Sequence, residues 1–298
     1  MPLPPESGKK PHRPAWLKVR LPNSKGYFEI KRLAREKNLH TVCEEARCPN
    51  ISECWGKRTA TFMILGEVCT RACRFCAVKT GLPKEYDLDE PRRVAEAVKT
   101  LNIRHAVITS VDRDDLADQG AFLFAETIRQ IRASQPETRI EVLTPDFHGS
   151  VDCLRTVLEA SPDVFAHNVE TVPRLYRTIR PGARFAWSTQ LLAEVKRLSP
   201  RTVTKSSVMV GLGETREELL EVMKVLRSIQ VNILTLGQYL QPTREHAPVE
   251  RFYPPEEFSE LKFLGESMGI PHVEAGPLVR SSYHAETQVV ALTGSPVY

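Results

Sequence analysis

Short apolar segments alternate along most of the chain with longer segments that have the spacing of helices. The apolar segments are rich in β-branched residues; a first one at residues 61–65 is followed by others that begin at residues 106, 140, 164, 203 and 232. The intervals between these last five starts all have the length of one strand–helix unit. Regular alternation of this kind predicts a parallel sheet with right-handed crossovers. We therefore expect an α/β fold that forms a closed or partial barrel.

Residues 216–229 show the helical spacing clearly. Apolar side chains recur there at the i, i+3, i+4 and i+7 positions that share one face of a helix. Thr215 and Glu218 precede the run in the arrangement of a capping box, in which each side chain binds the backbone of the other residue. The pattern predicts a helix that begins directly after Thr215.

Polar or glycine-rich residues follow each predicted strand, and in barrels functional groups gather at the carboxyl ends of strands. Ser110, Asn168 and Glu170 lie at such ends, and acidic and amide groups there often bind ribose hydroxyls. Loops are also polar for the simple reason that they face water. The pair Gly211 and Gly213 lacks the third glycine of a dinucleotide fingerprint, which argues against a Rossmann domain.

Composition and charge argue against a membrane-spanning protein and against a nucleic acid partner. The 298 residues are 41% hydrophobic and 26% charged, and no apolar run is long enough to form a membrane-spanning helix. The net charge of +4 is uneven, because residues 1–42 hold ten Lys and Arg against three Glu. Such a basic segment could steer an acidic protein or an anionic ligand, or it could be a solvated surface. No groove-reading motif accompanies it, so we expect no nucleic acid partner.

Six of the seven cysteines lie close together in the sequence and form two triplets: Cys43, Cys48 and Cys54, then Cys69, Cys73 and Cys76. The N-terminus lacks the apolar core of a signal peptide, so we expect a reducing, cytoplasmic location, where clustered thiols indicate metal or redox chemistry. Neither spacing is that of a structural zinc site. Three thiolates on a short loop fit three corners of an iron–sulfur cube and leave the fourth iron open. A zinc loop and a non-enzymatic iron–sulfur electron carrier or sensor are the alternatives.

The second triplet has the spacing Cys-x3-Cys-x2-Cys, with Phe75 before the last cysteine, and it directly follows the first predicted strand. This arrangement resembles the radical S-adenosylmethionine (SAM) superfamily. The resemblance implies a partial (βα)6-type TIM barrel in which Cys69, Cys73 and Cys76 hold a [4Fe–4S] cluster. It also implies that the amino and carboxylate groups of SAM chelate the open iron, with Ser110, Asn168 and Glu170 as expected SAM contacts.

Further motifs resemble one family within that superfamily, lipoyl synthase. They are Cys-x4-Cys-x5-Cys at 43–54, Thr-Ser-Val-Asp-Arg-Asp-Asp-Leu at 109–116, Thr-Pro-Asp-Phe at 144–147, His-Asn-Val-Glu-Thr at 167–171, Gly-Leu-Gly-Glu-Thr at 211–215 and Arg-Ser-Ser-Tyr-His-Ala at 280–285. The resemblance runs from about residue 14 to about residue 290 and keeps the family's motif order. A biotin-synthase-like or other sulfur-inserting radical SAM enzyme is the nearest alternative, and it would lack the first triplet and the Arg-Ser-Ser-Tyr motif.

The family resemblance implies a specific reaction. A 5′-deoxyadenosyl radical would remove hydrogen from C6 and then C8 of an octanoyl chain that is amide-linked to a lysine. Unactivated C–H bonds have no acid–base route, so a cofactor must supply the radical. Cys43, Cys48 and Cys54 would hold an auxiliary [4Fe–4S] cluster that donates the two sulfur atoms. The implied partners are the lipoyl domains of 2-oxoacid dehydrogenases, the glycine cleavage H protein, a reducing electron donor and an iron–sulfur carrier that rebuilds the cluster.

The fourth ligand of the auxiliary cluster is the open question at this site. The resemblance assigns it to a serine of the Arg-Ser-Ser-Tyr motif; we favour Ser282, with Ser281 as the alternative. An oxygen ligand is unusual where soft thiolate is the rule, and it would suit a cluster that is dismantled in use. Cys153 is the remaining thiol, and its apolar helical setting is typical of packing.

The resemblance also implies a division of the chain into three parts. At two positions the sequence differs from the usual family pattern. Residues 1–58 would form an N-terminal extension, 59–270 the barrel and 271–298 a C-terminal extension, with both extensions packed over the barrel mouth. Ser207 and Gln119 stand where the family usually has glycine, which puts local backbone geometry in question.

Overall fold

Seven parallel strands and one antiparallel edge strand form the main sheet of the computed structural model, which describes residues 13–18, 24–46 and 48–293. In sheet order the strands are β1 (His40–Thr41), β2 (Thr59–Ile64), β5 (His105–Ser110), β6 (Arg139–Leu143), β7 (Val164–Ala166), β8 (Val203–Val210), β9 (Ile233–Gln238) and β10 (His272–Gly276). β1 and β10 lie at the two ends of this order, so the barrel is open between them.

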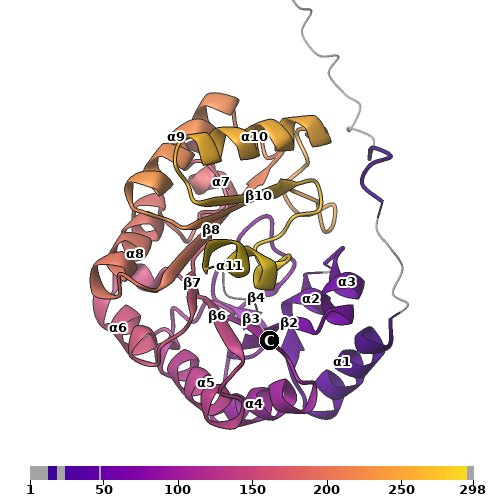
Figure 1. The fold of residues 1–298 in the computed structure, drawn as a ribbon, viewed down its shortest axis with the longest axis vertical. Coiled ribbons are helices and arrows are strands. Elements are labelled where there is room, and N and C mark those ends of the chain that lie inside the picture. Colours follow the sequence, from indigo (N-terminus) through magenta and orange to yellow (C-terminus); the bar gives the residue numbers. More distant parts are fainter. Residues whose placement is uncertain (1–12, 19–23, 47, 294–298) are drawn as a thin grey trace, which may run out of the picture.

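A ring of helices covers the outside of the curved sheet, as Figure 1 shows. In chain order these helices are α4 (Glu90–Thr100), α5 (Ala121–Ser134), α6 (Val151–Glu159), α8 (Phe185–Leu198), α9 (Arg216–Ser228) and α10 (Pro255–Ser267). Three short helical elements, η1 (Phe147–Gly149), η2 (Pro173–Leu175) and α7 (Tyr176–Ile179), follow strands β6 and β7. The capping box at Thr215 is present, which confirms the predicted start of α9.

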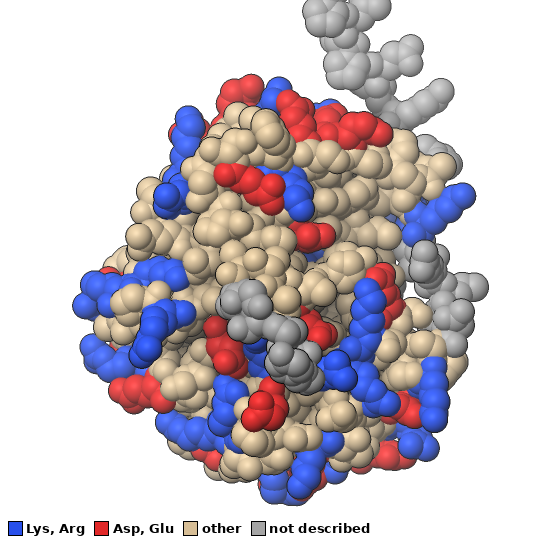
Figure 2. Space-filling model, viewed as in Figure 1, with Lys and Arg blue, Asp and Glu red and all other residues tan. Residues whose placement is uncertain are grey.

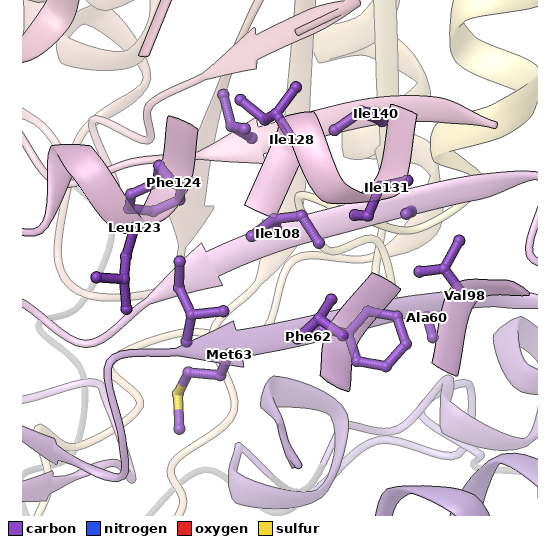
Figure 3. Close-up of a cluster of buried hydrophobic side chains, with 14 of the residues drawn as sticks. Ala60, Phe62, Met63, Val98, Ile108, Leu123, Phe124, Ile128, Ile131 and Ile140 are labelled. Atoms are coloured by element: carbon purple, nitrogen blue, oxygen red, sulfur yellow. The ribbon is translucent and has the colours of Figure 1, made fainter. Parts of the chain in front are cut away.

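The core between sheet and helices follows from the alternation of side chains along each strand. Phe62 and Ile108 point outward and join one buried cluster with Val98 of α4 and Ile128 of α5 (Figure 3). Burying one such side chain contributes roughly 1.5–3 kcal/mol to folding. A second buried cluster joins β8–β10 to α9 and α10. Together the two clusters hold the strands of the sheet against the outer helices.

The opposite face of the strands lines the barrel interior and carries a buried charged group. Glu141 binds Lys205 Nζ at 3.0 Å and His105 Nε2 at 3.1 Å, and none of the three side chains is more than 1% exposed. A carboxylate without partners there would be costly, and the pairing offsets that cost. These contacts hold the side chains of Glu141, Lys205 and His105 in position inside the barrel.

The six predicted parallel strands are present, with start positions within two residues of those expected from the sequence. β10 adds a seventh parallel strand beside β9, in a segment that the sequence assigned to the C-terminal extension. The two departures from the family pattern are accommodated: Gln119 adopts a left-handed φ of 49°, and Ser207 lies within β8.

The N-terminal helices α1 (Lys25–Glu36), α2 (Val42–Glu45) and α3 (Ile51–Gly56) lie beside β2 (Figure 1). The C-terminal helix α11 (Ala285–Thr293) differs from expectation in its position. Its Val289 packs against Val164 and Ile233, which begin β7 and β9. This apolar contact holds α11 at the amino ends of the strands, opposite to the expected mouth. No helix in the described part of the chain is long and apolar enough to cross a membrane.

Candidate functional site

The second cysteine triplet lies on the loop that follows β2, at the carboxyl ends of the parallel strands. Two short strands, β3 (Val68–Cys69) and β4 (Lys79–Thr80), pair with each other and close this loop. The backbone N–H and the hydroxyl of Thr70 both donate to the carbonyl of Asp112, at 3.0 and 2.9 Å. The triplet is therefore tied to the end of β5, at the barrel mouth, as the sequence predicts.

The Cys69 thiol lies in a cradle of backbone groups. Its sulfur accepts hydrogen bonds from the N–H groups of Arg71 and Asp112, at 3.4 and 3.3 Å. Burial is the main cause that raises the pKa of Cys69 and Cys73 to about 12, and it also raises the pKa of Cys76. These thiols are protonated at neutral pH, so binding of iron would release protons.

Arg71 fastens the cysteine loop to two neighbouring strands. Its guanidinium donates to both carboxylate oxygens of Asp114 at 2.8 Å and to those of Asp146 at 2.7 and 3.0 Å. The side chains of Arg71 and Asp146 are 2% and 0% exposed. Paired, bidentate contacts of this kind fix direction as well as distance. The loop is thus held over the ends of β5 and β6.

A second fastening comes from the loop after β9. His246 Nε2 lies 2.9 Å from the carbonyl oxygen of Cys76, and the N–H of Ala247 donates to the carbonyl of Arg74 at 2.8 Å. Because a carbonyl only accepts, we assign the His246 proton to Nε2. Its Nδ1 then accepts from the Thr243 hydroxyl, 2.8 Å away.

The expected SAM contacts lie beside this loop and offer unpaired polar atoms. Ser110 Oγ and Asn168 Oδ1 are buried and have no hydrogen-bond partner among the described residues. The amide of Asn168 donates to Glu170 Oε1 at 3.0 Å, and burial raises the pKa of Glu170. Buried groups without partners cost about 1–3 kcal/mol each, so they fit a polar ligand at this mouth.

The first triplet lies at the opposite end of β2 and lines a small pocket that is partly open to solvent. The lining residues come from α2, α3 and the link between them, from β2 and from the segment after β10: Cys43, Cys48, Asn50, Ile51, Cys54, Thr59, Thr61, Arg280, Ser282 and Tyr283. Ser282 is therefore brought to the three cysteines, whereas Ser281 is not in the lining. Burial raises the pKa of Cys43 to about 12 and also raises the pKa values of Cys48 and Cys54.

Cys153 lies apart from both triplets. It is 8% exposed and packs on α6 with Leu154 and Val157 in the core. Within residues 13–18, 24–46 and 48–293, no three side chains of His, Cys, Asp and Glu converge to hold one metal ion. The first triplet and Ser282 instead line one shared pocket.

Sequence reasoning missed Arg71, His246 and Glu53. Arg71 had a usable signal, since a cation inside a buried cysteine loop needs carboxylates and both Asp114 and Asp146 end predicted strands. The contacts of His246 and Glu53 join segments about 170 and 230 residues apart, which local spacing does not show.

Two family models match the chain. The model of the radical SAM superfamily matches residues 63–226, and the model of the N-terminal domain of lipoyl synthase matches residues 3–48. Among solved structures, the FeFe-hydrogenase maturase HydG from Carboxydothermus hydrogenoformans has a TM-score of 0.60 at 15% identity, over 89% of this chain and 60% of that chain. Methylornithine synthase has a TM-score of 0.53 at 13% identity, over 85% of this chain and 82% of that chain. At these identities the likeness shows the fold.

Curated proteins named lipoyl synthase are similar over nearly the whole chain. The chain is 60% identical to the one from Rubrobacter xylanophilus over 276 residues, which are 93% of this chain and 86% of the relative. It is 56% identical to that of Chloroflexus aurantiacus over 282 residues, 95% of this chain and 92% of the relative. For Bacillus cereus the identity is 57% over 278 residues, 93% of both chains.

The barrel and the cysteine loop at the carboxyl ends of its strands define a radical SAM enzyme, with an iron–sulfur cluster and SAM as cofactors. Identity of 56–60% over more than nine tenths of the sequence narrows this class further. The chain belongs to the lipoyl synthase family, which acts on a lipoyl carrier.

Proposed function

We propose that this protein inserts two sulfur atoms, at C6 and C8, into an octanoyl chain amide-linked to a lysine of a carrier protein, and that it uses two [4Fe–4S] clusters. The observation that carries the proposal is the gathering of Cys43, Cys48, Cys54 and Ser282 around one pocket, away from the second triplet. Two separate cysteine sites fit one site that generates a radical and another that supplies sulfur.

At the barrel mouth, Cys69, Cys73 and Cys76 would hold the first cluster. When bound there, the reduced cluster and SAM supply a 5′-deoxyadenosyl radical. Ser110 Oγ and Asn168 Oδ1 are the buried polar atoms that a SAM molecule would satisfy, and Glu170 holds the Asn168 amide in place. Arg71 and His246 keep the cysteine loop still, so that a reacting group is positioned without rearrangement.

At the pocket, Cys43, Cys48 and Cys54 would hold three corners of the auxiliary cluster and Ser282 the fourth. The oxygen of Ser282 is a harder ligand than the thiolates and is the more readily replaced one. Arg280 lines the same pocket and places a positive charge near Cys48, which would offset the negative charge of a thiolate-bound cluster. Tyr283 and Ile51 complete the lining of the pocket.

The proposed partners are the lipoyl domains of 2-oxoacid dehydrogenases, the glycine cleavage H protein, a reducing electron donor and an iron–sulfur carrier, in the cytoplasm. Figure 2 shows Lys and Arg gathered over α6 and α8 and along α1, where Lys25 and Arg32 are 91% and 74% exposed. An acidic carrier would be attracted to such a surface. The basic residues Lys9, Lys10 and Arg20 lie outside the described residues, as do residues 294–298. The proposed division of the chain is an N-terminal extension of residues 1–58, a barrel of residues 59–270 and a C-terminal extension of residues 271–298, whose first segment, β10, joins the barrel sheet.

Cluster content and product formation test the proposal together. After anaerobic purification with SAM, about eight iron and eight sulfide ions per chain fit two cubes of four. Ser282→Ala should still cleave SAM but form no lipoyl product. Cys153→Ala is the matched control, because its thiol is buried yet remote from the pocket, and it should form product normally. About four irons per chain, or full lipoyl yield from Ser282→Ala, would contradict the proposal.

A further inference from the structure

The segment that carries Ser282 is held to helix α3, which contains Cys54, by side-chain contacts between residues about 230 positions apart in the sequence. Asn50 Nδ2 donates to the carbonyl of Leu278 at 2.6 Å. Glu53 accepts from the Tyr283 hydroxyl at 3.2 Å and faces His284 Nε2 at 2.9 Å. We refer to residues 278–284 as the strap.

Glu53 lies within helix α3, and Asn50 directly precedes its first residue. Asn50 stands at its N-cap position, yet its side chain makes no capping hydrogen bond and is used for the strap instead. Glu53 directly precedes Cys54, so the residue that binds the strap is covalently next to an expected cluster ligand. A small shift of the strap relative to α3 would therefore change the distance between Ser282 and the three thiols.

Glu53 is the point where these contacts converge. Its carboxylate also accepts from Lys57 Nζ at 2.8 Å, one helical turn further along α3. Lys57 Nζ also lies 3.4 Å from His284 Nε2, so Lys57, Glu53 and the strap residues Tyr283 and His284 form one group of contacts. Tyr283 and His284 also stack on each other with ring centroids 3.8 Å apart, so one carboxylate holds both rings.

The strap has a second, independent support at the barrel. Gly237 ends the inward face of β9, and a Cβ atom built there would lie 2.0 Å from the carbonyl oxygen of Val279. No real Cβ contact is that short, so the strap backbone occupies the space of the missing side chain. The strap is thus seated on β9 at Val279 and held to α3 and its N-cap residue through Leu278, Tyr283 and His284.

We propose that Glu53 is the positioning residue of the auxiliary site: it holds the strap on α3 and thereby sets Ser282 at the fourth corner of the cluster. The proposal rests on the function proposed above, in which Ser282 is a cluster ligand. Glu53 is not among the residues that line the pocket. Its role differs from that of the cysteines, because its loss should loosen the strap and leave the radical-generating site unchanged.

The test compares the reconstituted enzyme with Glu53→Gln, Gly237→Ala and the control Glu36→Gln, all with SAM present. Glu36 is an exposed glutamate on α1 that pairs with Arg32 in the same helix. Amide hydrogen exchange of residues 278–284, iron per chain, 5′-deoxyadenosine and lipoyl product are measured for each protein. Exchange is the readout that does not depend on activity.

Glu53→Gln keeps the side-chain volume but removes the charge and one acceptor oxygen, so exchange in residues 278–284 should rise at least tenfold. Iron should fall from about eight to about seven or fewer per chain, because a corner iron without its ligand is easily lost, while 5′-deoxyadenosine forms at the normal rate. Gly237→Ala should give the same pattern by displacing the strap from β9. Glu36→Gln should match the wild type.

Unchanged exchange and unchanged iron in Glu53→Gln would overturn the positioning role. A loosened strap with full iron and full product would show that the strap contact is correct but that Ser282 is not a ligand. That outcome contradicts the proposed ligand set, and it is distinguishable from failure of the Glu53 contact itself.

Discussion

Arg71 and Asp146 form a doubly hydrogen-bonded ion pair, with distances of 2.7 and 3.0 Å, although 75 residues separate them in the sequence. One partner lies inside the Cys-x3-Cys-x2-Cys loop and the other at the end of β6. The ion pair therefore holds the cysteine loop, whose motif is local in sequence, at a fixed position on the barrel.

Removing this cation should destabilise the fold strongly. Arg71→Gln leaves Asp146 buried without its counter-charge, and breaking a buried pair typically costs about 3–5 kcal/mol. Arg92→Gln is the control, because Arg92 also meets two carboxylates, Asp89 and Glu96, but on the surface, where such pairs contribute about 0–1 kcal/mol. Urea unfolding of the iron-free proteins measures both changes; equal losses would contradict the structural role of Arg71.

The two cysteine triplets should separate in function. Cys69→Ala should abolish SAM cleavage, because it removes a thiolate from the cluster that binds SAM. Cys48→Ala should leave uncoupled SAM cleavage largely intact and abolish lipoyl product. The measurement is 5′-deoxyadenosine formed under dithionite beside lipoyl product. Equal loss of cleavage in both variants would mean that the triplets are assigned wrongly or depend on each other for folding.

His167 should make the stability of the protein fall in mild acid. Burial is the main cause that lowers its pKa to about 4; Nδ1–H donates to the Thr144 carbonyl and Nε2 accepts from the Ser188 hydroxyl, both at 2.8 Å. The unfolded chain takes up a proton as pH drops below about 6.5, while the folded protein does so only near pH 4. The contribution of the neutral His167 to the free energy of unfolding is therefore fully present above about pH 6.5 and is lost progressively as the pH falls to about 4.

The loss amounts to about 3 kcal/mol, since each unit of pKa shift corresponds to about 1.4 kcal/mol. His167→Gln cannot take up that proton, so its free energy of unfolding should vary less between pH 6.5 and 4.5 than that of the wild type. Urea titrations at a series of pH values give the difference. Parallel pH curves for the two proteins would assign the acid sensitivity to other groups.

The basic N-terminal segment gives a prediction about the carrier. If Lys9 to Lys37 steer an acidic carrier domain, its KM should rise as the Debye length falls from about 30 to about 8 Å, whereas KM for an octanoyl-lysyl peptide should change little. A variant with neutralised lysines should lose the salt dependence. Indistinguishable salt slopes for variant and wild type would make the segment an ordinary solvated surface.

Local patterns predicted the elements and the residue types of both sites, but not how the distant parts meet. The capping box at Thr215 and the β-branched strand segments act over a few residues, so their signals survive in the sequence. β10 contains few apolar residues, so the sequence indicates either a strand or a loop at residues 273–277, and the pairing with β9 makes this segment a strand. The position of α11 depends on Val289 reaching Val164 and Ile233 in distant parts of the sequence, which no spacing rule contains.

The same limit applies to the auxiliary site. The resemblance assigned the fourth ligand to a serine of the Arg-Ser-Ser-Tyr motif, for which we favoured Ser282 over Ser281, and Ser282 lines the pocket around the first triplet. What holds it there, Glu53 and Gly237, has no signature in the sequence. A glutamate next to a cysteine is common, and a glycine in a strand gives no indication of which backbone fills the space above it.

Strand β2 has the pocket of the first triplet at its start and the loop of the second triplet at its end. A parallel strand rises about 3.3 Å per residue, so residues 59–64 extend roughly 16 Å from the pocket toward the loop. Because β2 is paired on both edges, by β1 and β5, it is a fixed spacer that cannot shorten during a reaction cycle. Under the function proposed above, the acyl chain would have to move between the two sites, and the length of its lysine tether would decide which carbon atoms reach each site.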